Sequence, residues 1–269
     1  MISTRSDVDS IKADKPADIA NLFNNYFYTV YKPPRSASVY EELLPSNQLI
    51  SHFQHISQLH LSPGEVLDVL HHLDVSKATG PDKIPAKLLK NCAPCISNSL
   101  CAIFNKSLYL GKLPAAWEVA NIILIPKSGL PGEVSNYRPI SLLPIVSKVM
   151  ERCVYNRLIE DISGQLYKLQ HGFLNRKSTT SQLLEVLNEI GEMLDNRVEV
   201  DTIYLDFAKA FDRVDHHLLV KKLHLFSING SLFCWFSDYL SNRFQQVTVL
   251  GKTSNLLPVM FLGCRKVPF

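Results

Sequence analysis

The sequence predicts an α+β fold in which helices come first and strands then alternate with helices. Apolar residues recur at helical spacing in the N-terminal part, and the first strand-like run comes only at residue 119. No internal repeat or low-complexity segment interrupts this order. The chain has 269 residues, of which 46% are hydrophobic and 20% charged, so it can bury a sizeable core.

The first element is a helix in "PADIANLFNNYFYTVY", which follows a frayed tail of residues 1–15. Pro33 and Pro34 end this helix, because the residue before a proline is disfavoured in helical geometry. Residues 33–60 are predicted to be an irregular connector. The apolar side chains of the helix form one stripe, made of Ile19, Leu22, Phe23, Tyr26, Phe27 and Val30.

A second helix is predicted in "SPGEVLDVLHHL". Ser62 can cap it, Pro63 suits its first position, and Glu65 completes a capping box. The loop "SKATGPDKIP" follows, and a long helix of about residues 85–110 then ends near Gly111.

The run "VANIILIPK", residues 119–127, predicts a buried strand because it is rich in β-branched residues. The segment "SGLPGEVSNYRPISLLP" is predicted to be a long loop. Pro144 opens a helix that extends to about residue 162, and Ser178 caps the helix after it.

The last third predicts a strand at residues 200–206 and helices near 215–226 and 230–240. A hairpin around "GKTSN" completes the elements.

Cys92 and Cys95 form the one C-x2-C pair among the six cysteines. A zinc site would need a second pair of ligands at similar spacing, and none follows. His71 and His72 are adjacent, so on a helix they point in different directions. We therefore interpret the cysteines as reduced residues on helices.

Charge is unevenly distributed along the chain. Residues 1–75 carry a net charge of −4 and residues 76–269 carry +7, within an overall charge of +3. A basic C-terminal portion suits a polyanionic partner. No apolar run approaches the length of a membrane span, and the N-terminus has no signal-peptide core, so we expect a soluble intracellular protein without a membrane partner.

The stretch "DTIYLDFAKAFDRVDHH" carries four aspartates. If residues 202–206 form a strand, Asp206 lies at its end, where a carboxylate suits either a metal ligand or a helix N-cap. Two Mg²⁺ ions would require further carboxylates from a second acidic strand. The other three are interpreted as structural or solvated: Asp212 pairing with Lys209 or Arg213, Asp215 capping the next helix, and Asp201 in solvent.

The segment "YLDFAKAFDRVDH" resembles the first catalytic motif of reverse transcriptases from non-LTR (LINE-like, jockey/CR1-type) retrotransposons. Four earlier segments resemble successive motifs of that family in the family's order: "KATGPDKIPAKLLK", "IFNKSLYLGKLPAAWEVANIILIPKSG", "NYRPISLLPIVSKVMERCVYNRL" and "LQHGFLNRKSTTSQLL". The resemblance implies a right-hand polymerase fold with fingers, an incomplete palm and no thumb. It also implies three regions: a helical lead-in (1–60), fingers with a partial palm (61–259) and an aberrant tail (260–269).

The resemblance assigns chemistry to particular residues. Asp206 matches the catalytic, metal-binding aspartate, and the backbone carbonyl of Phe207 matches a position that also touches a metal. Phe211 matches the bulky gate that rejects a ribose 2′-OH, with a core phenylalanine as the alternative. Lys127 and Arg138 match residues that grip the incoming dNTP, with a solvated loop pair as the alternative.

A further group matches the "QxGF" element, for which we expect a role in template-side or structural support: Gln170, Gly172, Phe173 and Arg176. The cofactor implied is Mg²⁺, with Mn²⁺ possible, and the implied partners are an RNA template, a DNA primer and dNTPs. The family also implies a location in the nucleus or cytoplasm, and nothing in the sequence indicates an oligomeric state.

The chain departs from the family after "NLLPV". The family's "SGVPQGS" motif and its Ala-Asp-Asp hairpin are not found, and the chain reads "MFLGCRKVPF" instead. With allowed codons, an adjacent frame of residues 261–269 can spell "SGVPQGSI", so we hypothesise a frameshift that puts residues from about 260 onward out of frame. We expect this chain not to hold a metal pair and to be inactive by itself. The alternatives are a non-catalytic remnant or nucleic-acid-binding module, and a group II intron maturase-like reverse transcriptase.

Overall fold

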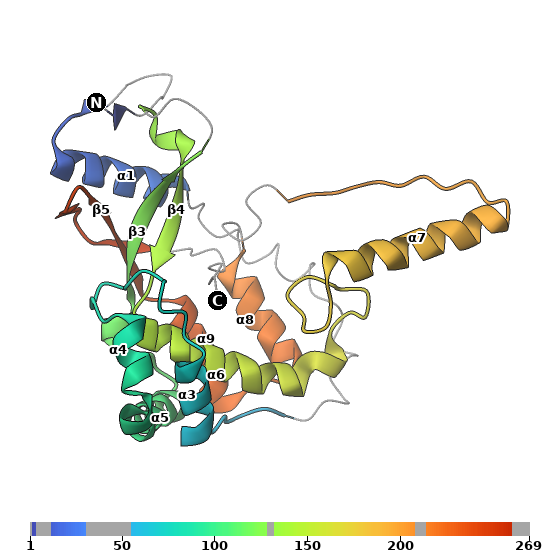
Figure 1. Ribbon diagram of the computed structural model, residues 1–269, viewed down its shortest axis with the longest axis horizontal. Coiled ribbons are helices and arrows are strands. Elements are labelled where there is room, and N and C mark those ends of the chain that lie inside the picture. Colours follow the sequence, from blue (N-terminus) through green and yellow to red (C-terminus); the bar gives the residue numbers. More distant parts are fainter. Residues whose placement is uncertain (1, 4–11, 31–54, 128–131, 208–213, 260–269) are drawn as a thin grey trace. The chain divides into compact units, whose positions relative to one another are not determined.

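The chain divides into two compact units in the computed structural model (Figure 1). Residues 1–157 and 209–269 form the large unit, and residues 158–208 form the small unit. The structure describes residues 2–3, 12–30, 55–127, 132–207 and 214–259.

Helices form most of the regular secondary structure in both units. The α-helices among the described residues are α1 Pro16–Val30, α3 Pro63–His71, α4 Ala86–Asn91, α5 Ala93–Leu110, α6 Ile145–Ile162, α7 Thr179–Asp195, α8 His216–Leu225 and α9 Gly230–Leu240. The strands are β1 Ile2–Ser3, β2 Lys12–Ala13, β3 Val119–Pro126, β4 Tyr137–Leu142, β5 Arg243–Val249, β6 Lys252–Thr253 and β7 Leu257–Val259. Short 3-10 turns lie at η2 Ala115–Trp117, η3 Val134–Asn136 and η4 Ser163–Gln165. Within the described part of the chain, no helix is both long and apolar enough to cross a bilayer.

The large unit contains a mixed sheet with strand order β4-β3-β5-β6, in which β7 also pairs with β5. β3 runs antiparallel to β4 and parallel to β5, with Ile122 opposite Val247. The hairpin of β5 and β6 turns at Leu250 and Gly251, both with positive φ, as the tightest hairpin turns require. The predicted hairpin around "GKTSN" is therefore confirmed.

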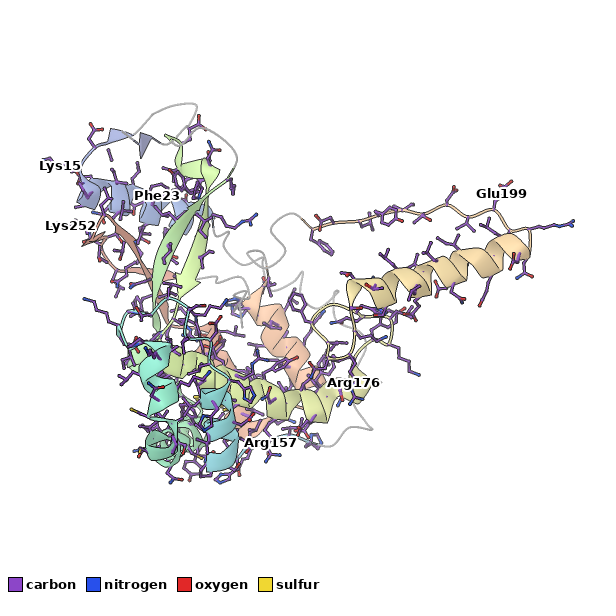
Figure 2. The ribbon with its side chains drawn as sticks, in the orientation of Figure 1. Lys15, Phe23, Arg157, Arg176, Glu199 and Lys252 are labelled. Atoms are coloured by element: carbon purple, nitrogen blue, oxygen red, sulfur yellow. The ribbon has the colours of Figure 1, made fainter. Side chains whose placement is uncertain are left out.

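Helix α1 covers one face of this sheet, and its predicted apolar stripe is confirmed from Ile19 to Phe27. The side chain of Val30 lies outside the described part of the chain. Phe23 is fully buried and extends from α1 toward the strands (Figure 2), where its ring meets Tyr137 edge-on at 5.0 Å between centroids. Ile122 and Val247 complete this core from β3 and β5. Because β-strand side chains alternate, the next residues along β3 face away from α1. The core thus determines which side chains of β3 remain exposed.

Strand β4 lies within the segment that the sequence predicts to be a loop, so that prediction is wrong. The Gly, Pro and Ser residues before it suggested an irregular segment through to Pro144. Instead Tyr137 to Leu142 pair with β3 over six residues. Hydrogen bonding to a neighbouring strand stabilises this segment more than its own composition opposes it.

The predicted helix of residues 85–110 is two helices. α4 ends at Asn91 and α5 begins at Ala93, with Pro94 in the first turn of α5. Proline has no N–H to donate and clashes with the preceding turn, so it starts a new helix here. Gly111 ends α5 with a φ of 64°, and a Cβ atom there would lie 2.7 Å from the Cβ of Cys234 on α9.

Helices α5 and α9 connect to the sheet through buried polar contacts. Trp235 of α9 donates from Nε1 to the Ser107 hydroxyl at 3.0 Å. Arg243, which begins β5, donates to the carbonyls of Tyr239 and Trp117 at 2.7 and 2.9 Å. A buried guanidinium requires such acceptors, so these bonds fix where β5 begins.

The small unit contains the end of α6, the turn η4, helix α7 and the extended segment of residues 196–207. Ser178 caps α7 as predicted, accepting from the Ser181 amide. The predicted strand at residues 200–206 is absent, and none of the described strands pairs with these residues. Their β-branched and aromatic composition favours a strand only when a neighbouring strand and a packed face are present.

Candidate active site

The hairpin of β3 and β4 carries Lys127 and Arg138. In its register Arg138 lies opposite Ile125. The amide of Lys127 continues the pairing by donating to the Asn136 carbonyl at 2.7 Å. Side chains alternate along strands, so Lys127, Ile125 and Arg138 share one face, and diagonal neighbours of this kind lie about 7–8 Å apart. The sheet therefore brings the two basic residues together.

This face is open to solvent, whereas the opposite face packs beneath α1. Ile123 and Ile125 are exposed on it, together with both basic side chains. The ammonium of Lys127 donates to the Ser135 carbonyl at 3.2 Å. The Arg138 guanidinium makes no hydrogen bond or ion pair with any residue that the structure describes. Its guanidinium is available to an external acceptor.

A guanidinium and an ammonium in this arrangement suit an anion with several oxygen atoms. Arg138 can offer two parallel N–H donors, and Lys127 supplies a compact point charge. Both are attached to a paired strand or its first turn, which positions side chains more precisely than a free loop does. The geometry can therefore bind a phosphate chain.

Asp206 and Phe207 lie in the small unit, in the extended segment that follows α7. Ile203, Tyr204, Leu205 and Phe207 are 80–89% exposed, as expected for an uncovered apolar segment, and Asp206 is exposed as well. No described residue gives the Asp206 carboxylate a hydrogen bond or an ion pair. The alternative of a helix N-cap concerns residues 208–213, which lie outside the described residues.

The donor set can be compared with what Mg²⁺ requires. Mg²⁺ prefers oxygen ligands such as carboxylates, so the exposed Asp206 side chain is a chemically suitable ligand for this ion. Two ions held together need several such oxygens. Within residues 12–30, 55–127, 132–207 and 214–259, no three His, Cys, Asp or Glu side chains converge as a metal site would require. The described residues alone therefore do not form a complete two-metal site.

The neighbouring predictions have different outcomes. Phe211 and Asp212 lie outside the described residues, and so does the tail of residues 260–269. Asp215 caps α8 as predicted, since its carboxylate accepts from the amides of His217 and Leu218 at 2.9 and 3.2 Å. Asp201 is exposed, as predicted.

The "QHGF" loop precedes α7 in the small unit (Figure 2). Gln170 donates from Nε2 to the Gly172 carbonyl at 3.2 Å, which tightens the loop. Phe173 and Arg176 have positive φ angles of 64° and 62°, a backbone conformation that residues other than glycine rarely adopt. Both side chains are exposed. The loop backbone thus presents an aromatic ring and a guanidinium to solvent.

His171 anchors this loop, a role that reasoning from the sequence missed. Its buried ring lies 3.0 Å from the Leu169 carbonyl through Nδ1 and 3.2 Å from the Glu185 carboxylate of α7 through Nε2. Both contacts use the ring nitrogens as donors when the imidazole is charged. No local pattern indicates this pair, because it forms only when the loop folds back on α7.

The described cysteines are free, as predicted. Burial raises the pKa of the Cys153 thiol to about 12, so this thiol stays protonated at neutral pH. Cys92 and Cys95 lie at the junction of α4 and α5, and none of the residues that the structure describes completes a metal site with them.

Comparison with known proteins connects these residues to one family. Residues 125–268 match the reverse transcriptase (RNA-dependent DNA polymerase) family. This range includes Lys127, Arg138, the "QHGF" loop and Asp206.

Individual relatives agree with this match. The RNA-directed DNA polymerase from mobile element jockey of Drosophila melanogaster is 36% identical over 199 residues, which cover 72% of this chain and 22% of that protein. The counterpart from Drosophila funebris is 34% identical, over 71% of this chain and 21% of that protein. The probable RNA-directed DNA polymerase from transposon X-element of Drosophila melanogaster is 33% identical, over 67% of this chain and 20% of that protein. The chain thus spans about a fifth of the length of these relatives.

Proposed function

Because this chain belongs to the reverse transcriptase (RNA-dependent DNA polymerase) family, we propose that it forms part of the RNA-directed DNA polymerase of a non-LTR retrotransposon. The relatives that support this origin are proteins of the mobile elements jockey and X-element. We assign residues 61–259 to the fingers and part of the palm. The reaction would join a dNTP to a primer on an RNA template.

The observation that carries this proposal is the register of the β3–β4 hairpin. It places Lys127 and Arg138 on one exposed face as diagonal neighbours, so that both long side chains can reach one triphosphate. We assign both residues to binding of the incoming dNTP. Phe211 is assigned to exclusion of the ribose 2′-OH, and the "QHGF" loop to support of the template.

Asp206 and the Phe207 carbonyl are assigned to the metal ion of the reaction. Mg²⁺, when bound, stabilises the negative charge that develops on the transferred phosphoryl group. The Asp206 carboxylate would contribute one oxygen ligand. The remaining ligands are not among the described residues, so we assign this chain only the binding of the dNTP and part of the metal site.

Direct dNTP binding tests the assignment of the hairpin. Titrating the purified chain with a fluorescent dATP analogue should show binding that Lys127→Ala and Arg138→Ala each weaken about tenfold, because a charge-assisted contact contributes about 1.5–3 kcal/mol. Lys106→Ala removes an equally exposed charge from α5 and should leave the affinity unchanged. Equal affinities for all four proteins would refute the assignment.

Primer extension tests the catalytic part. We expect residues 1–269 alone to incorporate no dNTP with Mg²⁺ or Mn²⁺, because Asp206 is the single carboxylate assigned to the metal. Template-dependent incorporation that Asp206→Ala abolishes would show that the segment holds a complete site and would contradict this expectation.

A further inference from the structure

A pocket of about 350 Å³ lies in the large unit, between α3 and α6. Its lining from α6 includes Ile145, Lys148, Val149 and Arg152, which share one helical face because of their three- and four-residue spacing. The facing wall comes from α3, and the loop after α3 closes one end. Its volume is at the lower end of the range for small-molecule sites, which is about 300–1,000 Å³.

The floor of the pocket is apolar. Val69 from α3, Ala86 from α4, and Ile145 and Val149 from α6 line it, and all four are buried. Such a floor offers nothing to a small hydrated ion, but it suits the face of a planar ring. The ligand should therefore carry an apolar or aromatic part.

The rim of the pocket is basic. Lys77, Lys148 and Arg152 line it. Lys90 lies at the margin, with its ammonium 3.1 Å from the carbonyl of Leu73, another lining residue. The Arg152 guanidinium lies 5.6 Å from the centroid of the Tyr155 ring, and a guanidinium suits phosphate in particular.

The two acidic residues of the rim have partners within their own segments. The Asp74 carboxylate accepts from the Ser76 amide and hydroxyl at 2.9 and 2.7 Å. Asp68 lies 3.4 Å from the ring of His72 on the same helix. The Asp74 carboxylate also lies 3.9 Å from the ammonium of Lys77, which belongs to the same loop. The three cations that line the pocket thus exceed its two carboxylates by one.

The loop that closes the pocket is held in place by a glycine. A Cβ atom at Gly80 would lie 2.5 Å from backbone atoms of Leu143 and Pro144, immediately before α6. The loop backbone can approach the start of α6 this closely only because Gly80 has no side chain. Lys77 and Ala78, which lie on this loop, are therefore set against α6 before any ligand arrives.

We propose that this pocket binds one nucleotide unit, with its base against the apolar floor and its phosphate on Lys148 and Arg152. The favoured source is an unpaired nucleotide of an RNA strand, and this choice of source rests on the proposed function. The pocket is separate from the dNTP assignment, which uses Lys127 and Arg138. It would hold a nucleic-acid strand at a second point on the large unit.

Fluorescence anisotropy on the purified chain tests this proposal, with a labelled single-stranded RNA of about twelve nucleotides. The double variant K148A/R152A should bind about tenfold more weakly. Its log affinity should also depend less steeply on log salt, by about 0.7 for each phosphate that the variant no longer neutralises. Ala78→Trp should weaken binding by a similar factor without removing any charge, because the indole fills the site of the base.

Two control variants separate the pocket from general effects. Lys106→Ala removes a charge outside the pocket, and Val75→Trp adds an indole at an exposed position that does not line it. Both should bind RNA as the unaltered chain does. Circular dichroism spectra that match the unaltered chain exclude unfolding as the cause of any loss.

The outcomes distinguish this proposal from the proposed function. Full RNA affinity in Ala78→Trp, or in K148A/R152A, overturns the pocket even if dNTP binding still depends on Lys127 and Arg138. Weaker RNA binding by both variants supports it. Competition by AMP then identifies a free mononucleotide as the source, whereas absence of competition identifies the strand.

Discussion

The β3–β4 hairpin of the large unit carries the residues assigned to the dNTP, and the segment around Asp206 in the small unit carries those assigned to the metal ion. The protein holds these two segments in different ways. Lys127 and Arg138 are attached to paired strands whose other face packs on α1. Asp206 lies on an extended segment with exposed side chains and no pairing strand among those described. The positions of the basic pair follow from a buried core, whereas nothing in the described structure constrains the carboxylate similarly.

The largest expected effect is the difference between a buried side chain of the large unit and an exposed side chain of the small unit. Phe23→Ala should lower the free energy of unfolding of the large unit by about 3–5 kcal/mol, because it leaves a cavity beneath the sheet. Leu187→Ala on α7, where the side chain is 62% exposed, should change stability by less than about 0.5 kcal/mol. Urea unfolding monitored by circular dichroism measures both. Similar decreases in the free energy of unfolding for the two variants would contradict this difference between the two positions.

A smaller effect is expected at two glycines. Gly111→Ala should cost about 1–3 kcal/mol, because its φ is positive and the new Cβ meets Cys234. Gly164→Ala, in the small unit, has no atom within 4 Å of the new Cβ and should be nearly neutral. Thermal unfolding of each variant against the unaltered chain provides the test, and a neutral Gly111→Ala would argue against the close approach of α5 and α9.

The third comparison concerns two aspartates of the same sequence stretch. Asp215→Ala should destabilise α8 by about 1 kcal/mol, because two amides lose their acceptor. Asp201→Ala, in the exposed segment, should have no measurable effect. Amide hydrogen exchange would detect the difference as faster exchange at His217 and Leu218 in the first variant alone. Unchanged exchange at both amides would contradict the capping role.

The smallest effect is a pH dependence. Burial alone would raise the pKa of Glu65, but hydrogen bonds from Ser62 and the guanidinium of Arg157, at 2.6 Å, hold it below its usual value of 4.5. A carboxyl with a depressed folded-state pKa contributes stability above its unfolded pKa, and that contribution is lost as the pH falls through the folded pKa. Glu65→Gln should therefore show a shallower loss of stability below pH 4.5. Identical acid dependence in both proteins would contradict this role of Glu65.

Local elements were largely predictable because their signals are local. Ser62 and Glu65 form the predicted capping box, with the Ser62 amide 2.7 Å from the Glu65 carboxylate. The apolar stripe of α1 and the cap at Asp215 were likewise predicted from residues that lie a few positions apart. Interactions over such short separations do not depend on how the rest of the chain folds.

The errors occurred where an element depends on distant partners. Strand β4 was missed because it forms by pairing with β3, and the strand at residues 200–206 was wrongly predicted from composition alone. The Glu185 partner of His171 and the pocket between α3 and α6 also escaped prediction, since each joins separate segments. Strand pairing and cavities depend on contacts that a local pattern does not contain.

By itself, the sequence determined the helices, their caps and the resemblance of five ordered motifs to a polymerase family. Only the tertiary structure decided that Lys127 and Arg138 share one exposed face, because that arrangement depends on the register between two strands and on the core beneath α1. It also decided that Asp206 lies on an exposed, unpaired segment rather than at the end of a strand. The physical reason is the same in both cases: side-chain chemistry is encoded residue by residue, but its placement depends on which distant segments pair and pack.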